Sequence, residues 1–314
     1  MNILHWMKKE NSGLARTTLE LVKYEEKQGH KVLAKEPGIG GDGATIYMAG
    51  MKMQDADVHC IHSQLAINTY YDNKPKFMWM HGEPLSSVAN GISMKAIVDL
   101  APKVDAFICM RREEQPIWNA IKRTYYVPKG IDLEHYKKLE GITERLSGEP
   151  AVLYVENWRG NRNPLYLCSA MQQVWEKFPN ARLHLYNCID KKMHETFSAL
   201  IKHTKWHLFI RSLLGQVSDI NMLYNRVDIV VSCLYPLYAR GIEAFSAGRA
   251  FIGPGYKEPG YPFTCNLDSP DSMAQAITSC WENYDKIDYR KWAEERHDVN
   301  ETVRQSIEIY QKYL

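Results

Sequence analysis

Short apolar runs alternate with longer amphipathic and polar stretches along most of the chain. Each run has the length of a buried strand, and several stretches between the runs are long enough for a helix. In the first part of the chain the runs fall at residues 3–7, 30–34, 58–62, 77–80, 106–109 and 125–127. This alternation predicts a parallel sheet with helices on both faces.

The first predicted helix covers residues 14–28. Leu21, Val22 and Glu25 follow the three–four spacing of one helix face, and Gly29 ends the pattern. With the strands before and after it, this helix forms a βαβ opening. A further helix is predicted over residues 115–123.

The same alternation begins again in the second part of the chain, with predicted strands at residues 151–155, 182–186, 228–231 and 250–252. The charged segment 139–150 contains two glycines and is the predicted linker. Residues 289–314 read as one long helix or two. The sequence therefore predicts an α/β fold of two doubly wound, Rossmann-like domains facing a cleft, at residues 1–140 and 150–288, with residues 289–314 packing back toward the first domain.

Composition narrows the class of protein. The 39 basic and 37 acidic residues leave a formal net charge of +2, which excludes a strong general field for nucleic acid or membrane surfaces. The seven cysteines include no Cys-x-x-Cys pair, and most lie in apolar runs, which is typical of reduced thiols. No stretch approaches the ~20 apolar residues of a membrane span, and no signal-peptide core is present. We expect a soluble, cytoplasmic protein.

One segment, residues 231–253, combines a strand, a loop, a helix and a second strand that follows Gly248. The helix is predicted to open near Arg240 and Gly241. A carboxylate at such a helix start, beyond the carboxyl end of a strand, suits the hydroxyls of a ribose, which makes Glu243 a candidate binding residue. The amides of Gly241 and Ile242 suit phosphate oxygens. The alternative is that Glu243 is an ordinary helix residue.

Two loops after predicted strands are candidate anion sites. The loop after residues 151–155 carries Asn157, Arg159 and Arg162, and an arginine can donate two parallel hydrogen bonds to phosphate oxygens. The loop before the first helix contains Gly13, which permits close approach of the backbone to a phosphate. A solvated basic loop and an ordinary strand-to-helix turn are the respective alternatives.

Histidines stand at the ends of two predicted strands. His81 follows the strand 77–80 and precedes Gly82, and Glu83 is the nearby carboxylate able to act as a general base. The pair His59 and His62 has metal-like spacing, but residues three apart in a strand point to opposite faces, so we expect no metal there.

The segment 231–253 resembles the donor-site motif of retaining GT-B glycosyltransferases of the family 4 type, Pro-Ser-x-x-Glu followed after seven residues by Glu-Ala-x-Ala-x-Gly. The matching positions are Ser232, Glu243, Ala244, Ala247 and Gly248. Tyr235 stands where this family has the first Glu, which contacts the donor sugar. The departure leaves the identity of the sugar open.

The resemblance extends to other segments. It gives Arg162 the place of the diphosphate-binding Lys and Asn157 that of the Arg, with Arg159 supplying a charge nearby. It likewise implies that Gly13 belongs to a loop against donor phosphate and acceptor, and that His81 faces the donor sugar and acceptor. Residues 127–132 resemble the turn that ends the first domain, where Gly130 permits a positive φ.

The resemblance implies a glycosyltransferase that moves a sugar, with retention, from a nucleotide-diphosphate sugar to a hydroxyl acceptor. A UDP-sugar is the default donor, and no metal is needed if arginines stabilise the leaving diphosphate. The acceptor is a carbohydrate or lipid, or a hydroxylated base in DNA; nucleic acid is the less favoured partner. A non-catalytic nucleotide-sugar-binding protein and a sugar-nucleotide epimerase are the alternatives. The sequence leaves the oligomeric state open.

Overall fold

The computed structural model describes residues 1–7, 13–36, 45–62, 72–81, 94–155, 165–186, 198–213, 219–233, 238–254, 259–266 and 269–314. Contacts between residues divide the chain into two compact units. Unit 1 comprises Met1–Asp132 and His297–Leu314, and unit 2 comprises Leu133–Arg296. The chain therefore passes between the units twice.

The described part of unit 1 contains a seven-stranded sheet in the order β3-β2-β1-β4-β5-β6-β7. All neighbouring strands pair in parallel except β2 and β3. The strands are β1 Asn2–Trp6, β2 Lys31–Lys35, β3 Thr45–Ala49, β4 Val58–Ile61, β5 Lys76–Met80, β6 Ala106–Cys109 and β7 Thr124–Tyr126. Six of them match the predicted runs to within two residues.

The antiparallel edge strand β3 was not predicted. Only residues 36–44 separate β2 from β3, and a parallel crossover needs a dozen or more residues. The short connection therefore allows β3 to pair with β2 only in the antiparallel direction.

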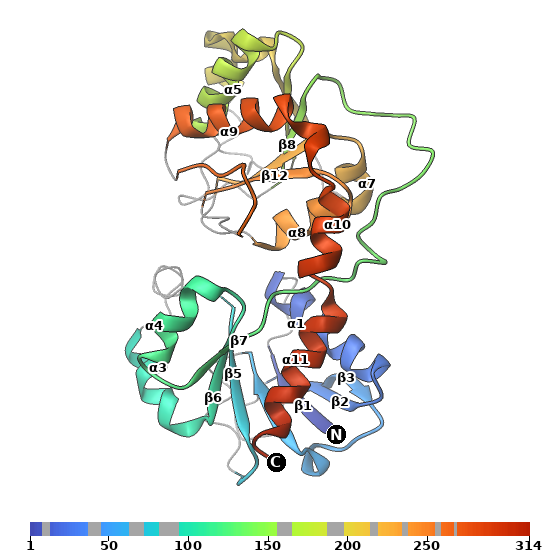
Figure 1. Cartoon of the computed structure of the whole chain (residues 1–314), viewed down its shortest axis with the longest axis vertical. Helices are drawn as coiled ribbons and strands as arrows, with labels where there is room; N and C mark the ends of the chain where they lie inside the picture. Colours follow the sequence, from blue (N-terminus) through green and yellow to red (C-terminus); the bar gives the residue numbers. More distant parts are fainter. Residues whose placement is uncertain are drawn as a thin grey trace. The chain divides into compact units, whose positions relative to one another are not determined.

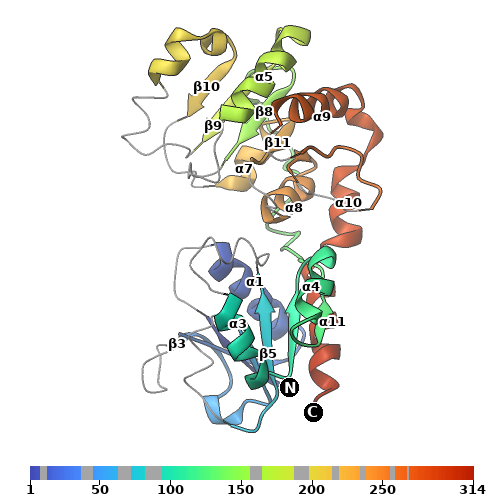
Figure 2. The same cartoon turned by 90° about the vertical axis from the view of Figure 1, so that its left-hand side faces the viewer.

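Helices cover both faces of this sheet (Figures 1 and 2). Helices α1 (Gly13–Lys27) and α11 (Val299–Gln311) pack against each other over one face. Helices α3 (Met94–Leu100) and α4 (Gln115–Asn119) contribute to the cluster on the other face. Successive residues of each strand point to opposite faces of the sheet. Apolar strand residues occur on both faces, so each face has its own hydrophobic cluster. Helix α4 ends at Asn119, four residues before the predicted end.

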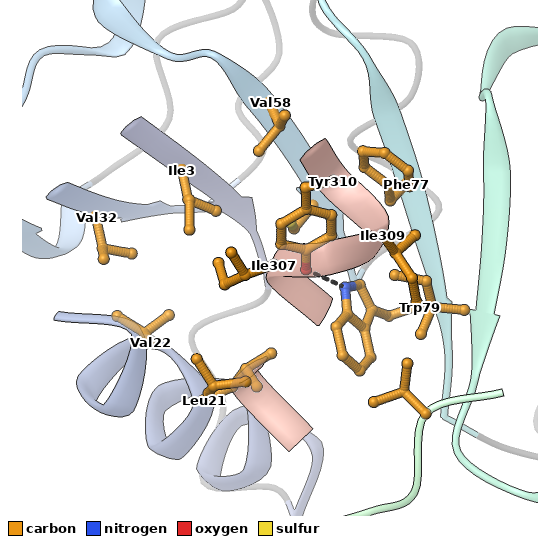
Figure 3. Packing of buried hydrophobic residues seen from close by; sticks show 14 of the residues in the cluster. Ile3, Leu21, Val22, Val32, Val58, Phe77, Trp79, Ile307, Ile309 and Tyr310 are labelled. Atoms are coloured by element: carbon orange, nitrogen blue, oxygen red, sulfur yellow. Dashed lines mark hydrogen bonds between the residues drawn. The ribbon is translucent and has the colours of Figure 1, made fainter. Parts of the chain in front are cut away.

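The C-terminal helix α11 is part of the core of unit 1. Figure 3 shows Tyr310 of α11 pointing toward Trp79 of β5, with Ile307 and Ile309 nearby. The indole N–H of Trp79 donates to Tyr310 Oη at 3.2 Å, and both side chains are buried. This bond satisfies an indole donor that would otherwise be buried without an acceptor.

Gly130 gives α11 room to pack. A Cβ on Gly130 would lie 2.5 Å from Val299 Cα and 2.5 Å from Thr302 Oγ1. Gly130 is not among the glycines that have a positive φ. Close packing against α11, rather than the turn geometry expected from the sequence, therefore requires glycine at this position.

Unit 2 contains, among its described residues, a five-stranded parallel sheet in the order β10-β9-β8-β11-β12. Helices α5 and α9 pack together on one face, and α8 lies on the other (Figures 1 and 2). The strands are β8 Ala151–Tyr154, β9 Arg182–Tyr186, β10 Ile210–Leu213, β11 Ile229–Val231 and β12 Ala250–Ile252. The helices are α5 Leu165–Lys177, α7 Ile220–Asn225, α8 Tyr238–Ser246, α9 Pro270–Glu282 and α10 Tyr289–Arg296. Strand β10 was not predicted.

Short 3₁₀ turns lie at Met53–Asp55, Ala101–Lys103, Arg112–Glu114, Lys205–Leu208 and Tyr284–Lys286. No helix among the described residues is long and apolar enough to cross a membrane.

The predicted linker 139–150 and the residues before it are bonded to unit 2. Asn225 accepts from the Leu139 amide at 2.9 Å and donates to the Lys137 carbonyl at 2.9 Å. Arg145 forms an ion pair with Asp228. Because these contacts bind the segment to α7 and β11, unit 2 begins at Leu133.

Candidate functional site

Three histidines lie together on the face of the unit 1 sheet that α1 covers. In the sheet register His5 of β1 pairs with Cys60 of β4, and Cys60 with Phe77 of β5. His62 lies two positions after Cys60 and His81 four positions after Phe77, so both point to the same face near the carboxyl ends of the strands. This geometry brings together His5, His62, which follows β4, and His81, which follows β5.

These rings and one carboxylate form a continuous series of hydrogen bonds, here called the histidine chain (Glu25, His5, His62 and His81). Glu25 Oε2 lies 2.6 Å from His5 Nε2. His5 Nδ1 lies 2.9 Å from His62 Nε2, and His62 Nδ1 lies 2.8 Å from His81 Nε2. The chain thus runs from the last turn of α1 to the end of β5.

Burial and ring stacking hold the chain rigid. Glu25 and His5 are fully buried, His62 is 7% exposed, and His81 is partly exposed. The rings of His5 and His62 stack at 5.2 Å, and Trp79 stacks on His62 at 5.6 Å. The side chains therefore have little freedom to adopt other rotamers.

The protein environment keeps the outer two rings neutral. Burial lowers the pKa of His62 well below its usual value, and the neighbouring His81 and His5 lower it further. Burial, together with the positive charge of Lys129, lowers the pKa of His81 to about 3. An uncharged imidazole has one N–H donor and one acceptor nitrogen, so each ring can pass on a hydrogen bond.

His59 points to the opposite face from His62, as strand spacing predicts. Its Nε2 lies 2.9 Å from Asp72 Oδ2, and its Nδ1 accepts from the indole N–H of Trp6 at 3.2 Å. Burial lowers the pKa of His59, although the charge of Asp72 opposes that shift. No group of three or more His, Cys, Asp or Glu among the described residues is arranged to hold a metal ion.

Unit 2 contributes Glu243 of α8, which is 5% exposed. Its Oε2 accepts from Tyr224 Oη at 2.7 Å and from Arg240 Nη1 at 2.8 Å. The charge of Glu243 and the Tyr224 hydroxyl hold the pKa of Arg240 well above its usual value. Among the described residues, Glu243 Oε1 has no hydrogen-bond partner, so one oxygen of a fixed carboxylate remains able to accept.

Helix α8 begins at Tyr238, earlier than the predicted start near Arg240. The amides without an intrahelical acceptor belong to the first turn, so the amides of Gly241 and Ile242 lie beyond them. Both residues are buried. A Cβ on Gly241 would lie 2.7 Å from the Phe251 ring of β12, which gives this glycine a packing role.

Of the remaining predicted site residues, the structure describes one. Gly13, predicted in the loop before the first helix, is the first residue of α1. The others, Glu83, Asn157, Arg159, Arg162 and Tyr235, lie outside the described residues.

Four partners in these clusters were not predicted as site residues from the sequence: His5, Glu25, Tyr224 and Arg240. Glu25 does carry a signal, because a carboxylate on the apolar face of a helix must be paired when buried. His5 lies in an otherwise apolar strand and gives a similar signal. Tyr224 carries none, since its bond to Glu243 joins α7 to α8.

No protein-family model and no curated protein sequence matches the chain. Solved structures share its fold over nearly the whole length. A glycosyltransferase from Rickettsia africae is 16% identical with a TM-score of 0.72, and the match covers 99% of this chain and 98% of that one. HepE of Anabaena in complex with UDP-glucose is 15% identical with a TM-score of 0.73, covering 99% and 100%.

AviGT4, a glycosyltransferase involved in avilamycin A biosynthesis, is 11% identical with a TM-score of 0.67, and the match covers 99% and 97% of the two chains. At these identities the likeness shows the fold. The chain has the GT-B fold, with parallel sheets and Rossmann-like features in both units.

Proposed function

We propose that this protein is a glycosyltransferase that moves a sugar from a nucleotide-diphosphate sugar, with UDP as the default nucleotide, to a hydroxyl acceptor. The observation that carries the proposal is the match of the whole chain to structures that include a glycosyltransferase and HepE bound to UDP-glucose. Fold alone does not define activity, so the site residues carry the rest of the argument.

The donor is proposed to bind unit 2. Glu243 Oε1 accepts from a ribose hydroxyl, while Tyr224 and Arg240 hold Oε2. Free amides of the first turn of α8, just before Gly241 and Ile242, face the phosphates. Asn157, Arg159 and Arg162 bind the diphosphate, and Tyr235 contacts the sugar. Fixed arginines stabilise the negative charge that develops on the leaving diphosphate, which removes the need for a metal.

The acceptor is proposed to bind unit 1. His81 contacts the donor sugar or the acceptor hydroxyl, with Glu83 as a candidate general base and Gly13 beside the phosphates. The configuration at the anomeric carbon is retained, as the resemblance of residues 231–253 implies. Carbohydrates and lipids are the favoured acceptors, ahead of a hydroxylated base in DNA. The described cysteines, which are buried free thiols, support a cytoplasmic location.

The proposal is tested with nucleotides and sugar nucleotides. Calorimetry with UDP, GDP, ADP and CDP identifies the base, and we expect UDP to bind most tightly. Release of UDP from UDP-sugars then measures hydrolysis or transfer. Binding of a UDP-sugar without release of UDP would favour a non-catalytic nucleotide-sugar-binding protein. Conversion of the donor's sugar without UDP release would favour a sugar-nucleotide epimerase.

A further inference from the structure

A buried chain of four polar groups is costly unless every donor and acceptor is paired. The histidine chain takes one residue from α1, one from β1, one from the end of β4 and one from the end of β5. Each contact is a direct hydrogen bond of 2.6 to 2.9 Å. Nitrogen atoms 2.8 to 2.9 Å apart leave no room for a bridging zinc, which requires ~2.0 Å to each nitrogen and a wider separation between them.

The donor and the acceptor of each hydrogen bond in the chain determine the tautomer of each histidine. An ionised Glu25 only accepts, so His5 must donate to it from Nε2. His5 Nδ1 then accepts from His62 Nε2, and His62 Nδ1 accepts from His81 Nε2. With neutral rings this is the single arrangement that satisfies all three bonds. It leaves a lone pair on His81 Nδ1, the outer end of the chain.

The same bonds allow a second state. If Glu25 holds a proton, it donates to His5, and each bond in the chain reverses direction. His81 then carries its proton on Nδ1. The second state contains one proton more than the first. That proton enters at His81 Nδ1, and the shift of protons along the chain leaves Glu25 protonated and uncharged. Neither state contains a buried imidazolium. The low pKa of His62 and of His81 disfavours the charged rings that a stepwise route would need.

The two ends of the chain suit this exchange. Among the described residues, His81 Nδ1 has no hydrogen-bond partner, and His81 is partly exposed. At the other end, Glu25 Oε1 is buried without a partner within the described residues. One end is therefore open to a ligand, and the other carries a carboxylate oxygen that is free to accept a hydrogen bond.

We propose that His81 Nδ1, in place of the Glu83 carboxylate, accepts the proton of a substrate hydroxyl. Glu25, His5 and His62 are positioning residues that present His81 in this state, and the proton is relayed through His62 and His5 to Glu25. The identity of the hydroxyl as that of the sugar acceptor rests on the proposed glycosyl transfer. The relay itself is a property of unit 1.

The transfer step balances. The acceptor O–H bond breaks, and its proton moves to His81 Nδ1. The Nε2 protons of His81, His62 and His5 each move to the next group, ending on Glu25 Oε2. The hydroxyl oxygen uses its electron pair to bond the anomeric carbon on the face from which the diphosphate departs, as retention requires, and the bond from that carbon to the diphosphate breaks with its pair on the leaving oxygen. One negative charge thus passes from Glu25 to the diphosphate, and the proton is later lost to water.

The first test measures the tautomers in the free protein. Nitrogen-15 spectra of protein labelled at histidine distinguish protonated from unprotonated ring nitrogens. We expect His81 to carry its proton on Nε2 and to have a bare Nδ1. A proton on His81 Nδ1 in the resting protein, or a charged His81 at neutral pH, would overturn the proposal. This measurement requires neither substrate nor activity.

The second test uses Glu25→Gln, which preserves shape but cannot store the proton. We expect kcat to fall by about 10²-fold, the scale of lost acid–base catalysis, with UDP affinity unchanged. The matched controls are His59→Gln and Asp72→Asn, which break the buried histidine–carboxylate pair on the other side of β4. They should lower the melting temperature while keeping turnover per folded molecule.

Equal turnover in Glu25→Gln and the parent, or an equal loss in the His59→Gln control, contradicts the relay. If Glu25→Gln fails to fold, His5→Phe provides the same comparison without removing a charge, and the tautomer spectrum of the parent still decides. A parent protein that transfers no sugar contradicts the proposed function, while the spectrum continues to test the relay separately.

Discussion

At the scale of single residues, a polar atom without a hydrogen-bond partner shows where a side chain can bind a ligand. Glu243 is held at Oε2 by Tyr224 and Arg240, so the direction of Oε1 is fixed before any ligand binds. Such preorganisation reduces the entropy lost when a ligand hydroxyl is bound. Glu243 is therefore the residue at which the proposed nucleotide site is most directly tested.

Glu243→Gln should weaken UDP binding by about 1–3 kcal/mol, the range for loss of a hydrogen bond to a charged group. Tyr224 and Arg240 both donate, so they hold the amide oxygen and turn the NH₂ group to the position of Oε1. That group cannot accept from a ribose hydroxyl. Calorimetry with UDP and its 2′-deoxy and 3′-deoxy analogues should show that the variant has lost the parent's preference for ribose.

Tyr224→Phe is the control for this prediction. It removes one donor to Oε2 and leaves Oε1 as an acceptor, so it should lower stability and retain the preference for ribose. If Glu243→Gln discriminates between UDP and its deoxy analogues as strongly as the parent, Glu243 does not bind the ribose.

The sequence predicts single residues better than their pairs. His81 could be placed at the end of a strand because the apolar run 77–80 precedes it. Its link to Glu25 depends on the lateral order of β1, β4 and β5 and on the position of α1, which are set by long-range packing. Local periodicity contains neither. The Tyr224–Glu243 bond joins two helices and was unpredictable for the same reason.

At the scale of elements, most strands were predicted well, whereas two helix ends were misplaced and the strands β3 and β10 were not predicted. A buried strand needs only a short apolar run, which periodicity detects. The end of α4 lies at a cap of backbone hydrogen bonds from the Ala120 amide, and β3 depends on the length of a connection; local periodicity contains neither. Gly130 shows the same limit: its motif predicts a turn, but its role is to let α11 approach.

Gly130→Ala should destabilise unit 1 by about 3 kcal/mol, the upper part of the range for overpacking. The added Cβ would meet backbone atoms of Val299 at 2.5 to 2.6 Å, and these cannot move without shifting α11. Hydrogen exchange of the α11 amides and urea unfolding measure the loss. The control is Gly29→Ala in the same unit, where no atom lies within 4 Å and only its positive φ of 88° costs about 1 kcal/mol. Equal losses in the two variants would exclude the packing argument.

At the scale of the whole molecule, the two chain crossings shape each unit. Near both crossings, Ile131 pairs with Asp298 in an isolated parallel bridge, and the Ile131 amide donates to the His297 carbonyl at 3.0 Å. Helix α10 therefore completes unit 2, while α11 completes unit 1. The alternation of strands and helices predicts two α/β halves. The assignment of α10 and of residues 133–150 to unit 2 depends on long-range contacts such as that of Asn225 with Leu139.

If the donor binds unit 2, UDP should stabilise that unit more than unit 1. Binding at 100 times the dissociation constant contributes about 2.7 kcal/mol to the state that binds. Hydrogen exchange followed by mass spectrometry should therefore show the largest gain of protection in the segments around α7, β11 and α8, with a smaller change in the strands of unit 1. Glu243→Gln at the same UDP concentration should reduce this gain, because fewer molecules are bound. Protection confined to unit 1 would place the nucleotide on the other half of the protein and contradict the donor site proposed for Glu243.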